Sequence, residues 1–255
     1  VDGQPVDPKR FDDDDLLERE LSYGRSGFAL KFMLDTSLSD VDRYPLKLSD
    51  LMVMSIDKDK APEKLVYGVM KEVKDLPNVG LSGDKFFAPE ALLGSYVDYD
   101  GSVLVIDPSG RGQDETAYAV VKMLNGYLYV AACGGIKGGY SEQTLTKLAH
   151  LAKDHKVNML LIESNFGDGM FTELIKPILK KIYPVTTEEV RHSKQKELRI
   201  IDTLEPVMNQ HKLIIDPKVI QDDFDSVQHH PTEKAQKYML TYQLTRVTKE
   251  RGSLA

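Results

Sequence analysis

Three apolar runs rich in β-branched and aromatic residues follow one another in the second half of the chain. They cover residues 102–107, 116–123 and 127–133, and each has the length of a strand. A glycine-rich turn separates the first run from the second. Asn125-Gly126, a strong hairpin signal, separates the second from the third. The pattern therefore predicts three sequential antiparallel strands.

A helix and a fourth strand are predicted directly after these runs. Ser141 is suited to cap a helix in which apolar residues recur at helical spacing up to Ala152. The next apolar run, 158–163, ends in Glu163, just as the first run ends in Asp107. Because a strand-helix-strand crossover is right-handed and usually joins parallel strands, the fourth strand can lie beside the first. The two acids would then meet where open α/β sheets place their sites.

The remaining elements complete an α/β fold. Helices are predicted over 168–183 with an interruption at Pro177, over 196–210 and over 219–227, and a short strand over 212–215. Apolar residues that alternate with mostly polar ones from 238 to 244 indicate an edge strand. The prediction for this half is one mixed sheet flanked by helices.

The first hundred residues are less regular. Short helices are predicted over 11–23 and 26–33, and a short apolar strand over 51–56. From residue 57 to about residue 100, charged residues, prolines and glycines indicate a linker with little regular structure. This half would not easily form a core alone, so we expect it to be the end of a unit that begins before residue 1. The predicted divisions are 1–60, a linker at 61–100, and a main domain at 101–255.

Composition narrows the class of protein. With 255 residues, 41% of them hydrophobic, the chain can bury a sizeable core. A net charge of -7 argues against a surface that binds nucleic acid everywhere, although a local basic stripe remains possible. The single cysteine, Cys133, excludes an internal disulfide framework and fits a reducing compartment. No apolar run reaches membrane-spanning length and no leader is evident, so we expect no membrane partner.

The acids at the strand ends are the candidate chemistry. Two carboxylates held close together repel each other unless a cation lies between them. Mg²⁺ and Mn²⁺ relieve that repulsion and prefer carboxylate and water oxygens. Two such ions about 4 Å apart can activate a water and stabilise the leaving oxygen of a phosphodiester. We predict Asp107 and Glu163 as metal ligands, and Asp114, across the turn, as a third ligand or an outer-shell acid.

Each of these acids also has an ordinary structural explanation. Asp107 can simply begin a turn at the end of its strand, and Asp114 can belong to the turn or the next strand start. A purely structural Glu163 is harder to explain, because a charge that ends an apolar run needs a partner. Asp168 is more typical of a helix cap than of a ligand.

Several cations are candidates to bind DNA phosphates. They are Arg111 in the glycine-rich turn and, near the start of the helix at 196, Arg191, Lys194, Lys196 and Arg199. Solvated surface is the alternative for each, although positive charges at a helix start oppose the helix dipole and require another reason. His229-His230 is interpreted as a surface loop and Cys133 as core packing.

The longest motifs resemble one known family. They are Asp107-Pro-Ser-Gly-Arg-Gly-Gln-Asp114-Glu-Thr116, Glu163-Ser-Asn-Phe-Gly-Asp168-Gly-Met-Phe171, and Lys196-Glu-Leu-Arg-Ile200 with Asp202-Thr-Leu-Glu-Pro206. Upstream, Phe32-Met-Leu-Asp-Thr-Ser-Leu-Ser-Asp40 and Tyr44-Pro-Leu-Lys-Leu48 match as well, as does Tyr242-Gln-Leu-Thr-Arg246 downstream. Together these motifs resemble the large terminase subunit, or DNA maturase B, of short-tailed double-stranded-DNA bacteriophages.

The resemblance implies a packaging motor whose C-terminal nuclease has a ribonuclease-H-like fold and cuts concatemeric DNA. Residues 1–60 would then be the tail of the ATPase domain, and 101–255 the metal-dependent nuclease. The implied partners are double-stranded DNA, the small terminase subunit, the portal and procapsid, and further copies of the subunit in a ring. The implied location is the cytoplasm of the host cell.

Two departures from the family pattern are visible. The sequence has no Gly-Lys-Ser or Gly-Lys-Thr, so the phosphate loop that would use ATP is expected upstream of residue 1. In the family, the segment after the one that resembles 249–255 begins with His-Asp-Asp and supplies another metal-binding acid, whereas this sequence stops at Ala255. The metal site is therefore expected to be incomplete in the sequence as it stands.

Three alternative functions stay open at this point. One is another nuclease or recombinase of the same fold, which the upstream motifs disfavour. The second is an actin-like or sugar-kinase-like ATPase, which would need a second acidic hairpin that the sequence lacks. The third is a non-enzymatic docking module for the portal or the small subunit.

Overall fold

The computed structural model describes residues 43–109, 114–163, 169–192, 194–231 and 235–252, with scattered positions between 7 and 33. The chain divides into two compact units, Val1–Pro45 and Leu46–Ala255. In the first unit the rings of Phe11 and Phe28 both contact Phe32. Within the helices predicted over 11–23 and 26–33, positions 14–16, 18, 19, 22, 28, 31 and 32 are helical, whereas 13, 17, 20, 21, 23, 26, 27, 29 and 30 lie outside the described residues. Within the described part of the chain, no helix is long and apolar enough to cross a membrane.

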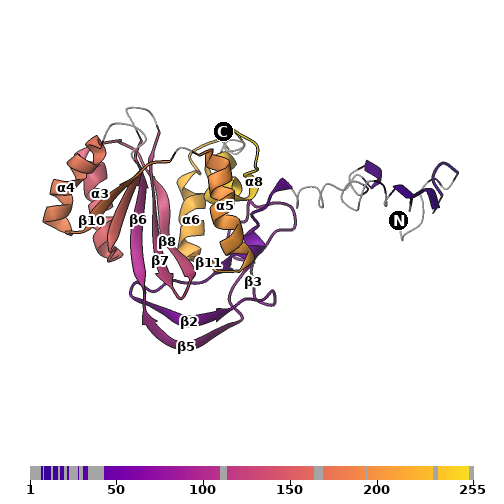
Figure 1. Cartoon of the computed structure of the whole chain (residues 1–255), viewed down its shortest axis with the longest axis horizontal. Coiled ribbons are helices and arrows are strands. Elements are labelled where there is room, and N and C mark those ends of the chain that lie inside the picture. Colours follow the sequence, from indigo (N-terminus) through magenta and orange to yellow (C-terminus); the bar gives the residue numbers. More distant parts are fainter. Residues whose placement is uncertain are drawn as a thin grey trace. The chain divides into compact units, whose positions relative to one another are not determined.

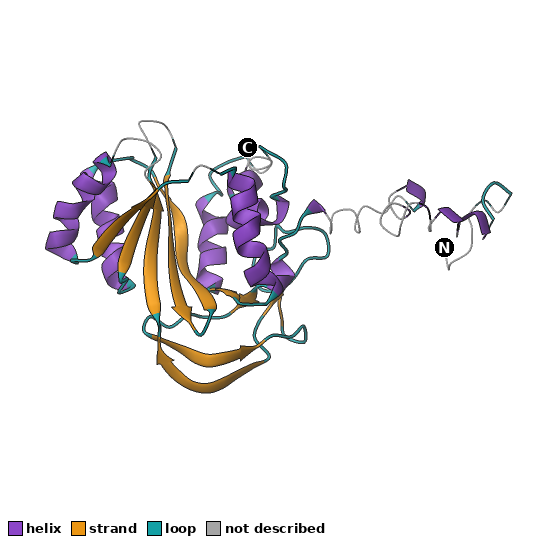
Figure 2. Cartoon of the chain, viewed as in Figure 1, coloured by secondary structure: helices purple, strands orange, loops and turns teal. Residues whose placement is uncertain are grey.

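The second unit is built on a nine-stranded mixed sheet with a separate two-stranded ribbon (Figures 1 and 2). The strand order in the sheet is β10-β9-β6-β7-β8-β11-β1-β4-β3, and the ribbon pairs β2 with β5. The strands are β1 (Met52–Val53), β2 (Lys60–Val66), β3 (Glu72–Val73), β4 (Phe86–Phe87), β5 (Ala91–Asp98), β6 (Gly101–Asp107), β7 (Thr116–Leu124), β8 (Tyr127–Ile136), β9 (Met159–Glu163), β10 (Thr186–Val190) and β11 (Leu213–Ile215).

Helices cover both faces of the sheet. They are α3 (Glu142–Asp154), α4 (Met170–Ile182), α5 (Lys196–Asn209), α6 (Pro217–Ser226) and α8 (Leu240–Arg246), with short 3-10 turns at Leu48–Asp50 and Gln236–Tyr238. The apolar sides of α3 and α4 pack on one face, against buried residues of β6 and β9. Those of α5, α6 and α8 pack on the other, against β11 and neighbouring residues. Figure 1 shows the two helical layers on opposite sides of the strands.

The central strands confirm the sequence prediction. β6, β7 and β8 pair antiparallel in sequence order, and Asn125 and Gly126 both adopt positive φ angles, of 51° and 78°, as a two-residue hairpin turn requires. Ser141 caps α3 and accepts a hydrogen bond from the amide of Thr144. After this crossover, β9 pairs parallel with β6. The helices predicted around 168–183, 196–210 and 219–227 are also present as α4, α5 and α6, although α4 continues through Pro177 without the predicted interruption.

The prediction of a linker at 61–100 is wrong. β3 and β4 are part of the main sheet, β2 and β5 form the ribbon, and the boundary between the two units lies at 45/46 rather than at 60/61 or 100/101. The short strand predicted over 51–56 is present as β1. Two reasons explain the error. Strands of two residues are too short to show a period, and β2 carries a proline and several charges that a ribbon with free edges tolerates. Whether residues 1–60 are the tail of an ATPase domain stays a prediction.

Two further predictions near the sheet edges fail. The alternating residues at 238–244 form a 3-10 turn and α8 instead of an edge strand. Leu240 and Leu244 are four positions apart, so they also share one face of a helix, and that face packs against the α5/α6 core. The sequence analysis missed β10, the observed edge strand, because its residues Thr186–Val190 are mostly polar and exposed.

The buried thiol and phenols make the fold sensitive to alkali. Burial raises the pKa of the Cys133 thiol to about 11 and that of Tyr129 to about 12. The protonated forms therefore favour the folded state fully below the unfolded pKa values, near 9 and 10, and that advantage is lost as the pH rises through 11 and 12. For Cys133 the loss is about 2–3 kcal/mol. We expect urea-unfolding free energies to fall between pH 9 and 11, and Cys133→Ala to reduce that slope. An identical slope in Cys133→Ala would contradict the assignment.

Candidate active site

The register of two parallel strands brings Asp107 and Glu163 together. Ile106 pairs with Ile162, and both side chains are buried in the α3/α4 core with at most 1% exposure. The next residue of each strand is the acid, so both carboxylates lie at the same end of the sheet, where the parallel strands β6 and β9 finish. The juxtaposition predicted from the sequence is present. Asp107 is exposed at the residue level, whereas the Glu163 side chain is 18% exposed.

The electrostatics of Asp107 reflect this neighbour. Although Asp107 retains contact with solvent, surrounding atoms withdraw part of its hydration, and this is the first cause that raises the pKa of the carboxyl. Repulsion from Glu163 raises the pKa further, while the charges of Lys196 and Arg199 lower it. The two carboxylates are therefore close enough to repel each other, and a cation bound between them would be stabilised.

The first turn of α5 supplies the positive charges that act on the two carboxylates. The guanidinium of Arg199 lies 3.7 Å from Oε1 of Glu163, and the Arg199 side chain is only 25% exposed. Lys196 stands one turn earlier on the same helix and acts on Asp107 through its charge. Both residues were predicted to reach DNA phosphates. The structure places Arg199 beside Glu163, and the charge of Lys196 acts on Asp107, which gives positive charges at this helix start a clear reason.

A buried hydroxyl pair closes the base of the glycine-rich turn. The amide and the hydroxyl of Ser109 each lie 3.1 Å from the hydroxyl oxygen of Thr116, which is 0% exposed. Residues 110–113, and with them Arg111, lie outside the described part of the chain. The sequence analysis did not single out this pair, although two hydroxyl residues that flank a turn at a strand end are a recognisable signal.

We expect Thr116→Val to destabilise the domain by about 1–3 kcal/mol. Valine has nearly the same shape, but it leaves the Ser109 amide without its acceptor and the Ser109 hydroxyl without its partner in a site that excludes water. Denaturant unfolding of Thr116→Val measures the change. Thr186→Val, at an exposed threonine that begins β10, is the control. Equal stabilities of Thr116→Val and the wild type would show that the pair does not hold the turn.

The structure describes the other candidate residues only in part. Asp114 is exposed, and among the residues that the structure describes no three His, Cys, Asp or Glu side chains converge to hold a metal ion. Asp168 lies outside the described residues, and Gly169 occupies the N-cap of α4. Arg191 and Lys194 are exposed near the start of α5.

The remaining residues from the sequence analysis have structural settings. The His230 ring lies 4.0 Å from that of His229 and 4.6 Å from that of Tyr238. Cys133 packs against the α5/α6 core, as predicted. Neither setting places a side chain beside Asp107.

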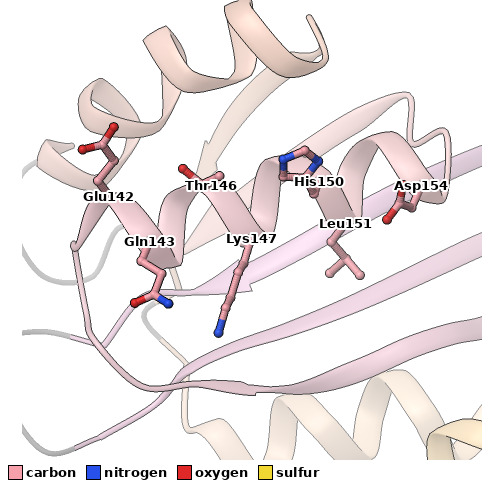
Figure 3. Close-up of a pocket in the computed structure, with 7 residues that line it drawn as sticks. All are labelled: Glu142, Gln143, Thr146, Lys147, His150, Leu151 and Asp154. Carbon is pink, nitrogen blue, oxygen red and sulfur yellow. The ribbon is translucent and has the colours of Figure 1, made fainter.

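A surface depression along α3 is separate from the two acids. Its volume is about 540 Å³, and all of its lining residues belong to this one helix. Figure 3 shows them along the helix: Glu142, Gln143, Thr146, Lys147, His150, Leu151 and Asp154. Neither β6 nor β9 contributes a residue, so the depression does not enclose the carboxylates.

The fold and the paired acids define the class. Three antiparallel strands, a crossover helix, a parallel fourth strand and an acid at the end of each parallel partner make a ribonuclease-H-like domain. Residues 106–213 match the family described as "Terminase Bacteriophage T7, Ribonuclease H-like domain". Over nearly its whole length the chain is also similar to a large terminase subunit.

The relative in question is the "Terminase, large subunit" of Enterobacteria phage T3. It is 46% identical over 255 residues, which cover 99% of this chain and 44% of that protein. The chain thus spans less than half the length of this relative. Solved structures with a similar fold include the nuclease domain of the large terminase subunit gp2 of bacterial virus Sf6, with 13% identity, a TM-score of 0.42 and coverage of 61% of this chain and 76% of that chain. The Mn-soaked human cytomegalovirus terminase nuclease domain is 12% identical, with a TM-score of 0.40 and coverage of 52% of this chain and 75% of that chain.

Proposed function

We propose that this chain is the nuclease part of a large terminase, a metal-dependent endonuclease that cuts concatemeric double-stranded DNA during viral genome packaging. The observation that carries the proposal is the pair Asp107 and Glu163 at the ends of adjacent parallel strands. Its support is the kinship with the large terminase subunit of phage T3. The reaction class is hydrolysis of a phosphodiester bond.

The two acids fit a hard divalent cation. Their oxygens are the donors that Mg²⁺ and Mn²⁺ prefer, and the raised pKa of Asp107 marks a place where a cation relieves repulsion from Glu163. Asp107 and Glu163 would hold the metal, with Asp114 as a third acid brought in from the turn. When bound, a two-metal centre would supply an activated water and stabilise the leaving oxygen. Arg199 holds the Glu163 carboxylate at the sheet edge.

The substrate and partners follow from the same kinship and are part of the proposal. Duplex DNA would run over the edge of the sheet that carries the acids, where Arg191 and Lys194 are exposed and can bind phosphates. Lys196 and the turn residue Arg111 would add to that contact. The small terminase subunit, the portal of the procapsid and further copies of the subunit are the proposed partners, in the host cytoplasm. ATP would serve the motor part of the whole protein.

Cleavage of a supercoiled plasmid tests the proposal. This chain and a version extended beyond Ala255 are each incubated with Mg²⁺, Mn²⁺ or chelator. We expect nicking that needs the metal and is lost on substitution of Asp107, and the difference between the two versions reports the contribution of the extra acid. If neither version cuts with any metal, independent nuclease activity is excluded, and binding to the portal becomes the function to test.

A further inference from the structure

The segment at 247–252 folds back onto the first turn of α5. The amide of Gly252 donates a hydrogen bond of 2.6 Å to Oε1 of Glu197, and Nε2 of Gln195 donates one of 3.3 Å to the carbonyl of Lys249. Val247 and Thr248, where the segment begins, are 1% and 5% exposed. The segment is therefore anchored at both of its ends.

Glu197 is the centre of this contact. It is only 7% exposed, and its pKa is lowered by hydrogen bonds to its own amide and to that of Gly252, with further help from Gln195 and Arg251. A carboxylate in a first turn also interacts favourably with the helix dipole. Gly252 has a φ of +83°, which favours glycine, and no atom lies within 4 Å of the position that a Cβ would take there.

The same helical turn carries the two cations of the active site. Lys196 and Arg199 oppose the dipole at a helix start, and the N-cap residue Gln195 makes no side-chain capping hydrogen bond. This first turn is therefore destabilised by its positive charges and lacks the side-chain hydrogen bond that commonly stabilises a helix start. Glu197, which lies between the two cations in sequence, supplies the opposite charge and a firm contact with the segment at 247–252.

We propose that Glu197 is a positioning residue of the nuclease site. By binding the Gly252 amide, it fixes the first turn of α5 so that Arg199 stays against Glu163 and Lys196 stays near Asp107. The inference rests on the proposed nuclease function, but it makes a structural claim that is measurable without cleavage. In this role Glu197 acts through the cations on its own helical turn.

Side-chain nuclear magnetic resonance tests the structural claim. In the wild type we expect separate, slowly exchanging guanidinium signals for Arg199, whose Nη2 lies 3.7 Å from Oε1 of Glu163. In Glu197→Ala and Gly252→Ala these signals should merge with those of mobile arginines, and the amide of residue 252 should exchange faster. Asp202→Asn, which removes an exposed carboxylate from the same helix, is the control and should change neither. An unaltered Arg199 signal in variants whose amide at 252 exchanges faster would overturn the inference.

A double-mutant cycle tests the functional claim. Outer-shell partners of metal sites commonly change activity by 10- to 100-fold, so we expect Glu197→Gln to slow Mn²⁺-dependent nicking about tenfold. In the background Lys196→Gln with Arg199→Gln, the same change should have less than about a twofold effect, because the groups through which it acts are gone. Undiminished loss in that background, or a normal rate in Glu197→Gln, would refute the positioning role. A wild type that never cuts would instead refute the proposed function and leave the resonance result to decide the inference.

Discussion

Asp107→Asn is expected to reduce Mn²⁺-dependent DNA cleavage by more than about a hundredfold, beyond the usual effect of outer-shell substitutions. The amide keeps the shape of the side chain and removes the charge that would bind the metal. The metal-free protein should be at least as stable as the wild type. Hydration lost at the sheet edge and repulsion from Glu163 both disfavour the ionised form, as the raised pKa of Asp107 shows.

The measurement is a pair of assays on the same preparation. Nicking rates report cleavage, and thermal unfolding with and without Mn²⁺ reports stability and binding, since a ligand at a hundred times its Kd stabilises by about 2.7 kcal/mol. Asp98→Asn is the matched control, because Asp98 also ends a strand and its side chain is 84% exposed. A lower melting temperature without metal in Asp107→Asn would indicate a structural role for the acid.

Glu163→Gln should abolish cleavage to a similar extent and, unlike the change at Asp107, should also lower stability. Glu163 is the partner of Arg199 at 3.7 Å in a setting where both side chains are mostly covered. A neutral amide weakens that attraction and leaves a partly buried guanidinium, at a cost of about 1 kcal/mol. The two acids are therefore expected to be equal in catalysis and unequal in stability.

Comparison of the two substitutions in one set of unfolding curves checks this asymmetry. Glu188→Gln is the control for the loss of one negative charge. Glu188 is an exposed acid on β10, the strand that pairs with β9. If Glu163→Gln and Asp107→Asn shift the midpoint of unfolding equally, the ion pair with Arg199 contributes nothing specific. Retained cleavage in Glu163→Gln would remove Glu163 from the proposed metal site.

The juxtaposition of Asp107 and Glu163 was predictable because its signals are strong. A run of apolar residues that ends in an acid occurs at both Asp107 and Glu163, and one crossover rule is enough to place them side by side. The hairpin at Asn125-Gly126 and the cap at Ser141 are local signals. In these two cases neighbouring residues alone determine the geometry.

Other parts depend on contacts between distant residues, which a pattern does not show. The role of Arg199 at Glu163 requires α5 to return to the sheet edge, and the contact of Glu197 with Gly252 joins residues 55 positions apart. The strands between 60 and 98 were missed for the same reason, because their partners rather than their own residues make them strands. The roles of Asp114 and Arg111 stay predictions.

The position of β1 in the sheet has a consequence for the order of folding. β1 lies between β11 and β4, and Met52 pairs with Ile214; the amide of Ile56 also binds Asp216, 160 positions away. During synthesis, therefore, the partner strand β11 exists only after about 160 more residues have left the ribosome. Such distant pairing costs loop entropy before any contact forms, which makes it slow. We therefore expect the β6–β9 part, with the acids, to assemble first and the sheet to close around β1 last.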